Sequence, residues 1–170
     1  MSDIKPLFNL VTPDNIYEVL KFKKNEFSKR LYQLLASKKV ASIRIKTSKL
    51  TDSQITEIVD QRKEVSKKIT ILIENDLRVV ARLKLDGVHL TNGHKFVQEA
   101  KSFLCRDQVI GAFCGLSKHS GLTAHEYGAN YISFQADFNR AETNKATIDL
   151  FEWWSNFIEI PLMGSAQVTV

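Results

Sequence analysis

Two cations on one expected strand are the first residues of the chain that could do chemistry. Residues Val40 to Lys46 alternate between apolar and polar side chains, so Arg44 and Lys46 share one face of that strand. If helices cover the apolar face, both cations point toward the interior of a barrel near the strand's carboxyl end. Cations held there indicate an anionic ligand. An edge strand with one solvated face would show the same alternation, and both interpretations remain open.

A second polar group follows an apolar run. Ile71 to Ile73 stops at the corner Glu74-Asn75-Asp76, a short amphipathic segment follows, and Val88 to Leu90 forms a second apolar run that carries His89. This pattern predicts strand, short helix, strand, with both strands parallel in one sheet. The polar corner then falls at the rim of the sheet, where α/β folds build their sites.

The other histidines and the cysteines carry weaker signals. The spacing of His89 and His94 matches no zinc-ligand pattern, and His119 is typical of a helix surface or cap. Cys105 and Cys114 are too few for a disulfide framework or a zinc site, so we expect two reduced thiols.

The elements that must position these residues alternate regularly. Expected strands and helices alternate about seven times along the chain. The expected strands are Leu7–Val11, Val40–Lys46, Ile71–Ile73, Val88–Leu90, Val109–Cys114, Tyr131–Phe134 and Ile160–Met163. The expected helices include a long one from Ile16 to about Ser37, one that Thr51 and Gln54 begin as a capping box, and an aromatic-rich one from Asn144 to Ile158.

This alternation allows a doubly wound sheet or a β/α barrel. None of the seven glycines forms a phosphate-binding loop of the GxGxxG or GxxxxGK[ST] kind, which favours the barrel. We therefore expect one domain over residues 1–170: an α/β fold of the β/α (TIM-type) barrel kind, incomplete, with about seven strands and no eighth βα unit.

Composition narrows the class of protein. The chain has 170 residues, of which 44% are hydrophobic and 25% charged, as in ordinary soluble globular proteins. The start MSDIKPLFNL lacks a signal-peptide pattern and no apolar run could span a bilayer, so we expect a cytoplasmic protein without membrane contact. The net charge of +5 is spread over solvated helix faces without a continuous basic stripe, which argues against nucleic-acid binding.

Four segments together carry a resemblance to a known family. They are Asp86-Gly87-Val88-His89-Leu90, Val109-Ile110-Gly111, Gly128-Ala129-Asn130-Tyr131-Ile132 and Phe151 to Pro161. In this order and spacing they resemble the thiamine-phosphate synthase and thiazole tautomerase family, in its alphaproteobacterial-type branch. The resemblance implies a β/α barrel that uses Mg²⁺ to join a pyrimidine methyl diphosphate to a thiazole phosphate, releasing pyrophosphate.

The resemblance also implies site residues. The family's inward Gln-x-Arg-x-Lys of the second strand corresponds to Arg44, Lys46 and Ser48. Its Thr-x-Thr-Lys loop survives in part as Thr143-Asn144-Lys145. Expected substrate or phosphate contacts are therefore Arg44, Lys46, Ser48, His89, Thr143 and Lys145, and the expected metal ligands are Asn75 and Asp76. Counting back from Asp86 without gaps places Glu74 and Asn75 at the metal positions, and a slip of one residue gives Asn75 and Asp76.

Several positions depart from the family's pattern. Where the family has Gly-Gln-Glu-Asp, whose Asp binds metal, this chain has Thr91-Asn92-Gly93-His94, without a carboxylate. Ala166-Gln167-Val168-Thr169 replaces the phosphate-binding Gly-Gly-Ile-Thr, and Gly115 stands where the tautomerases have a histidine. An amide binds Mg²⁺ much more weakly than a carboxylate, so we expect impaired metal binding, and no residue is assigned as catalytic.

Two kinds of function follow. One is a thiamine-phosphate synthase of impaired activity. The alternative is a non-catalytic, truncated relative that binds a phosphorylated ligand, or that forms homo-oligomers through the unpaired edges of its barrel.

Overall fold

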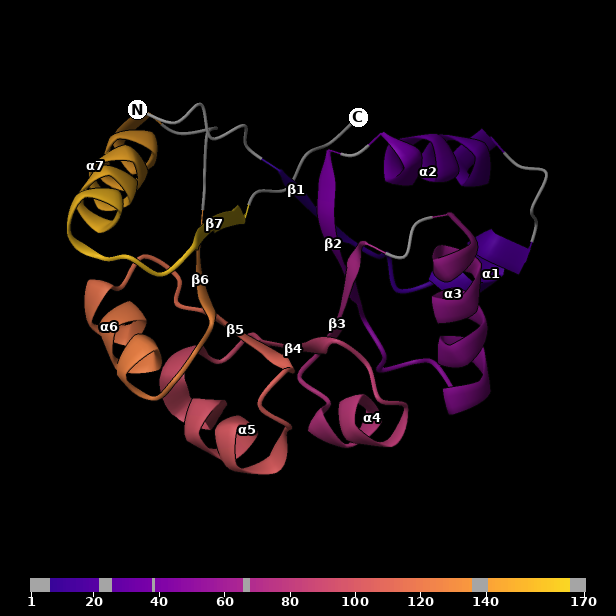
Figure 1. Cartoon of the computed structure of the whole chain (residues 1–170). Helices are drawn as coiled ribbons and strands as arrows, with labels where there is room; N and C mark the ends of the chain where they lie inside the picture. Colours follow the sequence, from indigo (N-terminus) through magenta and orange to yellow (C-terminus); the bar gives the residue numbers. More distant parts are fainter. Residues whose placement is uncertain (1–6, 22–25, 38, 66–67, 136–140, 166–170) are drawn as a thin grey trace. The chain divides into compact units, whose positions relative to one another are not determined.

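The computed structural model describes residues 7–21, 26–37, 39–65, 68–135 and 141–165 (Figure 1). The chain divides into two compact units, residues 1–87 and 88–170. In both units strands alternate with helices, as the apolar pattern predicts. None of the described helices is long and apolar enough to cross a membrane.

The first unit holds three strands in chain order. Its elements are β1 (Phe8–Val11), α1 (Ile16–Lys21), α2 (Glu26–Ala36), β2 (Val40–Ile45), α3 (Asp52–Val65), β3 (Thr70–Glu74) and α4 (Leu77–Arg82). The central strand β2 pairs in parallel with both neighbours, so that Arg44 stands opposite Val11 on one side and Leu72 on the other. Arg44 therefore lies on an inner strand, and Lys46 follows directly after the end of that strand.

The single long helix expected from Ile16 to about Ser37 is wrong. The structure has two helices there, α1 and α2, which run in different directions (Figure 1). Residues 22–25, which would join the two helices into one, lie outside the described residues.

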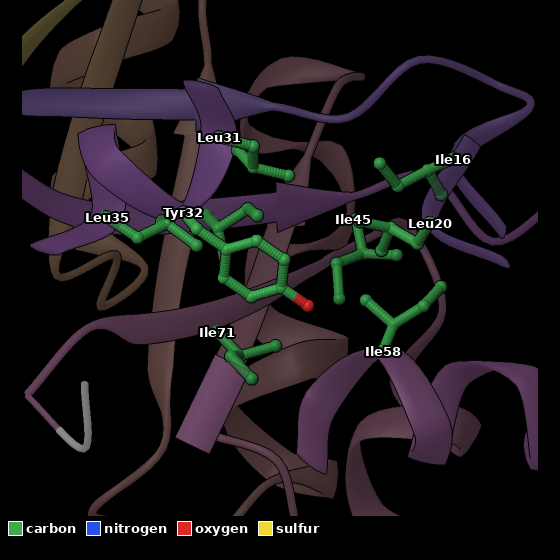
Figure 2. Close-up of a pocket in the computed structure, with 9 residues that line it drawn as sticks. Ile16, Leu20, Leu31, Tyr32, Leu35, Ile45, Ile58 and Ile71 are labelled. Atoms are coloured by element: carbon green, nitrogen blue, oxygen red, sulfur yellow. The ribbon is translucent and has the colours of Figure 1, made fainter. Parts of the chain in front are cut away.

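Helices α1, α2 and α3 cover one face of β2 and β3. Ile43 and Ile45 of β2 contribute to the same apolar lining as side chains from all three helices, with the ring of Tyr32 among them (Figure 2). Because side chains alternate along a strand, Ser42 and Arg44 face the opposite side. This confirms the direction expected for the polar face of β2.

The second unit holds four strands in the order β4-β5-β6-β7. Its elements are β4 (Gly87–Leu90), the 3-10 turn η1 (Gly93–Phe96), α5 (Val97–Phe103), β5 (Val109–Phe113), α6 (Lys118–Glu126), β6 (Tyr131–Gln135), α7 (Ala141–Phe157) and β7 (Leu162–Ser165). The pairs β5–β6 and β6–β7 are parallel. The seven strands of the described residues are those that the sequence predicts, with small differences at their ends.

An aromatic cluster fixes α7 against β6 and α6. The ring of Phe134 meets those of Trp154 and Phe151 edge-on, with centroids 5.1 and 6.2 Å apart. Gly121 makes this approach possible, because a Cβ there would lie 2.7 Å from the Trp154 ring. Aromatic pairs of this geometry stabilise a core by about 1 kcal/mol beyond their burial.

Candidate functional site

Two ion pairs stand at the carboxyl end of β2. Arg44 Nε lies 3.3 Å from Glu74 Oε2 of the neighbouring strand β3, and both side chains are largely covered, at 12% and 21% exposed. Lys46 Nζ lies 3.4 Å from Asp14 Oδ1, which follows β1, and this pair is more open to solvent. Each expected anion-binding cation therefore has a carboxylate beside it.

Thr12 fixes the backbone around these cations. Its amide donates to the carbonyl oxygen of Arg44 at 2.9 Å, and its Oγ1 accepts from the amide of Lys46 at 3.1 Å. Thr12 is itself buried, with 4% of its surface exposed. The end of β2 is therefore held on a defined backbone, as a binding site requires.

Arg44 and Glu74 form an ion pair, but the Nε of Arg44 donates no hydrogen bond to the carboxylate. The Nε of Arg44 is buried but forms no hydrogen bond with any atom of the described residues. A guanidinium carries five N–H donors in a planar fork, so one carboxylate at 3.3 Å leaves much of its donor capacity for another anion. The geometry of Arg44 suits a phosphate or carboxylate that could displace Glu74.

The polar corner after β3 serves a helix. Asp76 is the N-cap of α4, and its Oδ1 accepts a hydrogen bond from the Val79 amide at 3.0 Å. Asn75 adopts a left-handed backbone with φ of 59° and is exposed. The two expected metal ligands thus form the turn between β3 and α4.

The structure shows little about the other three expected phosphate contacts, Ser48, Thr143 and Lys145. Ser48 lies exposed in the loop between β2 and α3. Thr143 and Lys145 lie in the first turns of α7, and their side chains are outside the part of the chain that the structure describes.

In the second unit, His89 is fully buried and meets a tyrosine. Its Nδ1 lies 2.6 Å from the hydroxyl of Tyr131, and the two rings stack with centroids 5.7 Å apart. His89 stands on β4 and Tyr131 on β6, with Gly111 of β5 between them in the strand order. All four residues of β4 are buried, and His89 has an exposed fraction of 0%.

A second polar group joins η1 to α6. His94 Nδ1 lies 3.3 Å from Ser120 Oγ in the first turn of α6, and the imidazoles of His94 and His119 meet edge-on at 6.2 Å. Burial raises the pKa of the neighbouring Cys114 thiol, and a hydrogen bond with Ser120 lowers it by a smaller amount. Both cysteines are free, as expected, and only Cys114 is buried.

The apolar cavity in the first unit does not resemble a site for a charged substrate. It measures about 20 Å³ and is lined almost entirely by aliphatic side chains on the helix-covered face of β2 (Figure 2). A cavity of this size and character is a packing gap that stays dry.

Comparison of the sequence with models of known protein families gives a match over almost the whole chain. A family model described as thiamine monophosphate synthase matches residues 9–169. The chain belongs to the thiamine monophosphate synthase family. This confirms the family that the four sequence segments indicate.

Curated relatives within this family are thiamine-phosphate synthases. The protein of Erythrobacter litoralis is 35% identical over 106 residues, which cover 59% of this chain and 50% of the relative. The protein of Hyphomonas neptunium is 28% identical over 170 residues, which cover 95% of this chain and 75% of the relative. The first of these matches thus spans half the length of that relative.

A solved structure shows the fold. The thiamine phosphate pyrophosphorylase from Pyrococcus furiosus superimposes with a TM-score of 0.67 over 96% of this chain and 76% of that chain, at 15% identity. The expected α/β fold of the incomplete TIM-type barrel kind is therefore confirmed, with seven strands in the described residues.

Family membership raises the question of a metal ion. Among the described residues, no group of three or more His, Cys, Asp or Glu side chains is arranged to hold one. Glu74 faces Arg44, and one carboxylate oxygen of Asp76 caps α4. These donors do not fit a metal site built by the protein itself, although Mg²⁺ often binds through a single carboxylate and substrate phosphates.

Three features of the site escape sequence reasoning. Tyr131, Ser120 and the partner carboxylates Glu74 and Asp14 each act across strands or elements that are distant in sequence. Only Tyr131 has a sequence signal that could reveal it: Gly111 in the middle of an apolar strand indicates close approach of another group.

Proposed function

We propose that this chain is a thiamine-phosphate synthase, which joins a pyrimidine methyl diphosphate to a thiazole phosphate and releases pyrophosphate. Membership of the family supports the reaction class. The observation that carries the proposal is the pair of cations, Arg44 and Lys46, on the polar face at the carboxyl end of β2. Parallel α/β barrels place their sites at this end of the strands.

The chemistry requires cations at this place. When the carbon–oxygen bond to the diphosphate breaks, the leaving group takes the electron pair, and the pyrimidine methylene carries the positive charge. Fixed positive charge lowers the barrier by stabilising the anion that forms. Arg44 can bind two phosphate oxygens at once, whereas Lys46 supplies a compact point charge.

Two carboxylates compete with the ligand for these cations. Glu74 faces Arg44, and Asp14 faces Lys46. A diphosphate carries more charge and more acceptor oxygens than either carboxylate, so it displaces them and releases Glu74 and Asp14 to solvent. Ser48, Thr143 and Lys145 are further phosphate contacts in this proposal, and His89 is a pyrimidine contact.

Mg²⁺, which the family implies, would neutralise the departing diphosphate. Asn75 and Asp76 are the residues of the first unit that correspond to metal ligands. In this proposal Arg44 and Lys46 bind the phosphate oxygens of the diphosphate.

The test is formation of thiamine phosphate from the two phosphorylated substrates with Mg²⁺ present. Arg44→Gln and Lys46→Met should each lower kcat/KM by about tenfold or more, the effect of losing one charge-assisted hydrogen bond. Arg30→Gln is the matched control, because Arg30 is an exposed cation on α2 paired with Glu26. Equal activity of all three variants and wild type would contradict the proposed role of β2.

A binding protein without turnover is the second candidate. The observation that favours it is that both cations are already paired with carboxylates, while the described donors form no metal site. This candidate predicts that calorimetry detects pyrophosphate binding that Arg44→Gln weakens, while no thiamine phosphate forms from the complete substrate mixture.

We also propose that copies of the chain associate through β1. Among the described residues β1 stands at the end of the strand order, next to β2, and Phe8 and Val11 expose 57% and 44% of their surface. A strand edge flanked by apolar side chains is a template for pairing with another chain. Sedimentation should show a dimer that Phe8→Lys converts to a monomer, and a monomer at all concentrations would exclude this association.

A further inference from the structure

A tyrosine and a histidine meet across β5 in the interior of the second unit. Tyr131 is 7% exposed and His89 is 0% exposed. The hydroxyl of Tyr131 and Nδ1 of His89 are 2.6 Å apart, which is a short distance for a hydrogen bond of a hydroxyl group. The ring planes differ by 23°, so the two side chains lie nearly flat against each other.

Gly111 makes this arrangement possible. Its Cα stands opposite that of Tyr131 in the pairing of β5 with β6. A Cβ at this position would lie 2.0 to 2.3 Å from the Tyr131 ring and hydroxyl, far closer than atoms in contact allow. The ring of Tyr131 therefore occupies the space over β5 that a side chain at position 111 would otherwise fill.

Each of the three residues belongs to a different segment of the family resemblance. His89 lies in Asp86–Leu90, Gly111 ends Val109–Gly111, and Tyr131 lies in Gly128–Ile132. Three segments that look independent in the sequence thus meet in one buried contact.

We propose that Tyr131 is a positioning residue that fixes the orientation of the His89 imidazole, with Gly111 providing the space. This inference rests on the proposed function, in which His89 contacts the pyrimidine. It goes beyond that function by assigning roles to Tyr131 and Gly111.

The physical basis is the asymmetry of the imidazole ring. A half-turn about the bond between Cβ and the ring exchanges ring nitrogens with ring carbons, and the hydrogen bond to Tyr131 selects one of the two orientations. The same bond determines which nitrogen carries the proton, because a partner that accepts from or donates to Nδ1 fixes the tautomer. A ring held in one orientation and one tautomer presents a defined donor or acceptor at its other nitrogen.

The first test uses the protein without substrate. Histidine-ring ¹⁵N NMR spectra of wild type and Tyr131→Phe are compared, with His89→Gln identifying the His89 signals among the four histidines of the chain. We expect Tyr131→Phe to shift the His89 ring resonances and leave the other histidines unchanged. Unchanged His89 resonances would overturn the proposal.

The second test separates positioning from simple packing. Tyr131→Phe should keep the wild-type fold by circular dichroism, bind the pyrimidine diphosphate more weakly and lower kcat/KM by about tenfold, as misplacement of a contact group does. Tyr127→Phe is the matched control, since Tyr127 contacts the ring of His94 and not that of His89. Gly111→Ala should resemble Tyr131→Phe in the NMR spectrum, because the added methyl displaces the tyrosine ring.

The outcomes distinguish this inference from the proposed function. A wild-type protein that neither binds the pyrimidine diphosphate nor turns over would overturn both. A wild type that is active, with Tyr131→Phe equal to it in affinity and kcat/KM, would overturn the positioning role alone. Loss of activity in Tyr131→Phe together with the NMR shift, and neither in Tyr127→Phe, supports the role.

Discussion

The carboxylate of Asp86 holds the start of the neighbouring strand. Its Oδ2 accepts a hydrogen bond from the backbone amide of Ile71 at 2.7 Å. The second unit repeats this arrangement: Oδ1 of Asn130, the residue before β6, accepts from the amide of Ile110 in β5 at 2.7 Å. In both places a side chain just before a strand accepts a hydrogen bond from the amide of the second residue of the preceding strand.

This arrangement predicts the effect of replacing Asp86. Asp86→Ala leaves a partly buried amide without a partner and should lower the free energy of unfolding by about 1 to 3 kcal/mol. Asp86→Asn keeps an oxygen in the same place and should cost less. Urea unfolding of the three proteins measures the difference, and equal losses for Ala and Asn would contradict this account.

Replacing Asn130 tests the corresponding hydrogen bond in the second unit. A carboxylate at this position would accept a hydrogen bond from the Ile110 amide as well as the amide oxygen of Asn130 does. Asn130→Asp should therefore keep the thermal midpoint of wild type within the error of the measurement, whereas Asn130→Ala should lower it. A clear loss in Asn130→Asp would show that the amide nitrogen of Asn130 matters as well.

Local patterns were sufficient to predict the strands and the faces of β2. Ile43 and Ile45 alternate with Arg44, and burial against α1, α2 and α3 follows from that alternation. The same kind of reasoning predicted one helix where the structure has α1 and α2. Periodicity predicts which face is buried, but the end of a helix depends on a few residues.

The sequence predicted only those site residues that lie close together along the chain. Arg44 and Lys46 were found because they lie two residues apart at the end of one expected strand, on the same face. Their partners are distant in sequence: Glu74 lies on β3 and Asp14 in the turn after β1. Tyr131 meets His89 across β5, where Gly111 has no side chain. Such pairings depend on strand order and register, which apolar spacing does not encode.

The pairing of Glu74 with Arg44 predicts a gain from removing the carboxylate. Glu74→Gln abolishes the competing charge while keeping the size of the side chain, so pyrophosphate should bind several-fold more tightly, with a steeper dependence on salt. Calorimetric titration at low and high salt measures both effects. Glu26→Gln is the control, because Glu26 forms an exposed pair with Arg30 on α2. Weaker binding in Glu74→Gln would indicate that Glu74 itself contacts the ligand.

The buried thiol of Cys114 should make the free energy of unfolding depend on pH in the alkaline range. Burial raises the pKa of its thiol above the ordinary value of 9.0, so the unfolded chain loses this proton at lower pH than the folded protein does. The free energy of unfolding should therefore fall as pH rises above about 9, with no contribution from Cys114 below that range. Urea unfolding between neutral and high pH should show a shallower fall in Cys114→Ala than in wild type. Cys105→Ala is the control, because Cys105 is exposed.

Asp76 separates a structural role from a metal-binding role. In the structure its Oδ1 caps α4 through the Val79 amide, and asparagine caps helices about as well as aspartate does. Asp76→Asn should therefore retain both stability and substrate affinity, whereas Asp76→Ala should lose about 1 kcal/mol of unfolding free energy.

A metal ligand behaves differently, because an amide binds Mg²⁺ far more weakly than a carboxylate. If Asp76→Asn is as stable as wild type but its turnover needs much more Mg²⁺, Asp76 binds the metal during the reaction. If its dependence on Mg²⁺ is unchanged, the contribution of Asp76 is the helix cap.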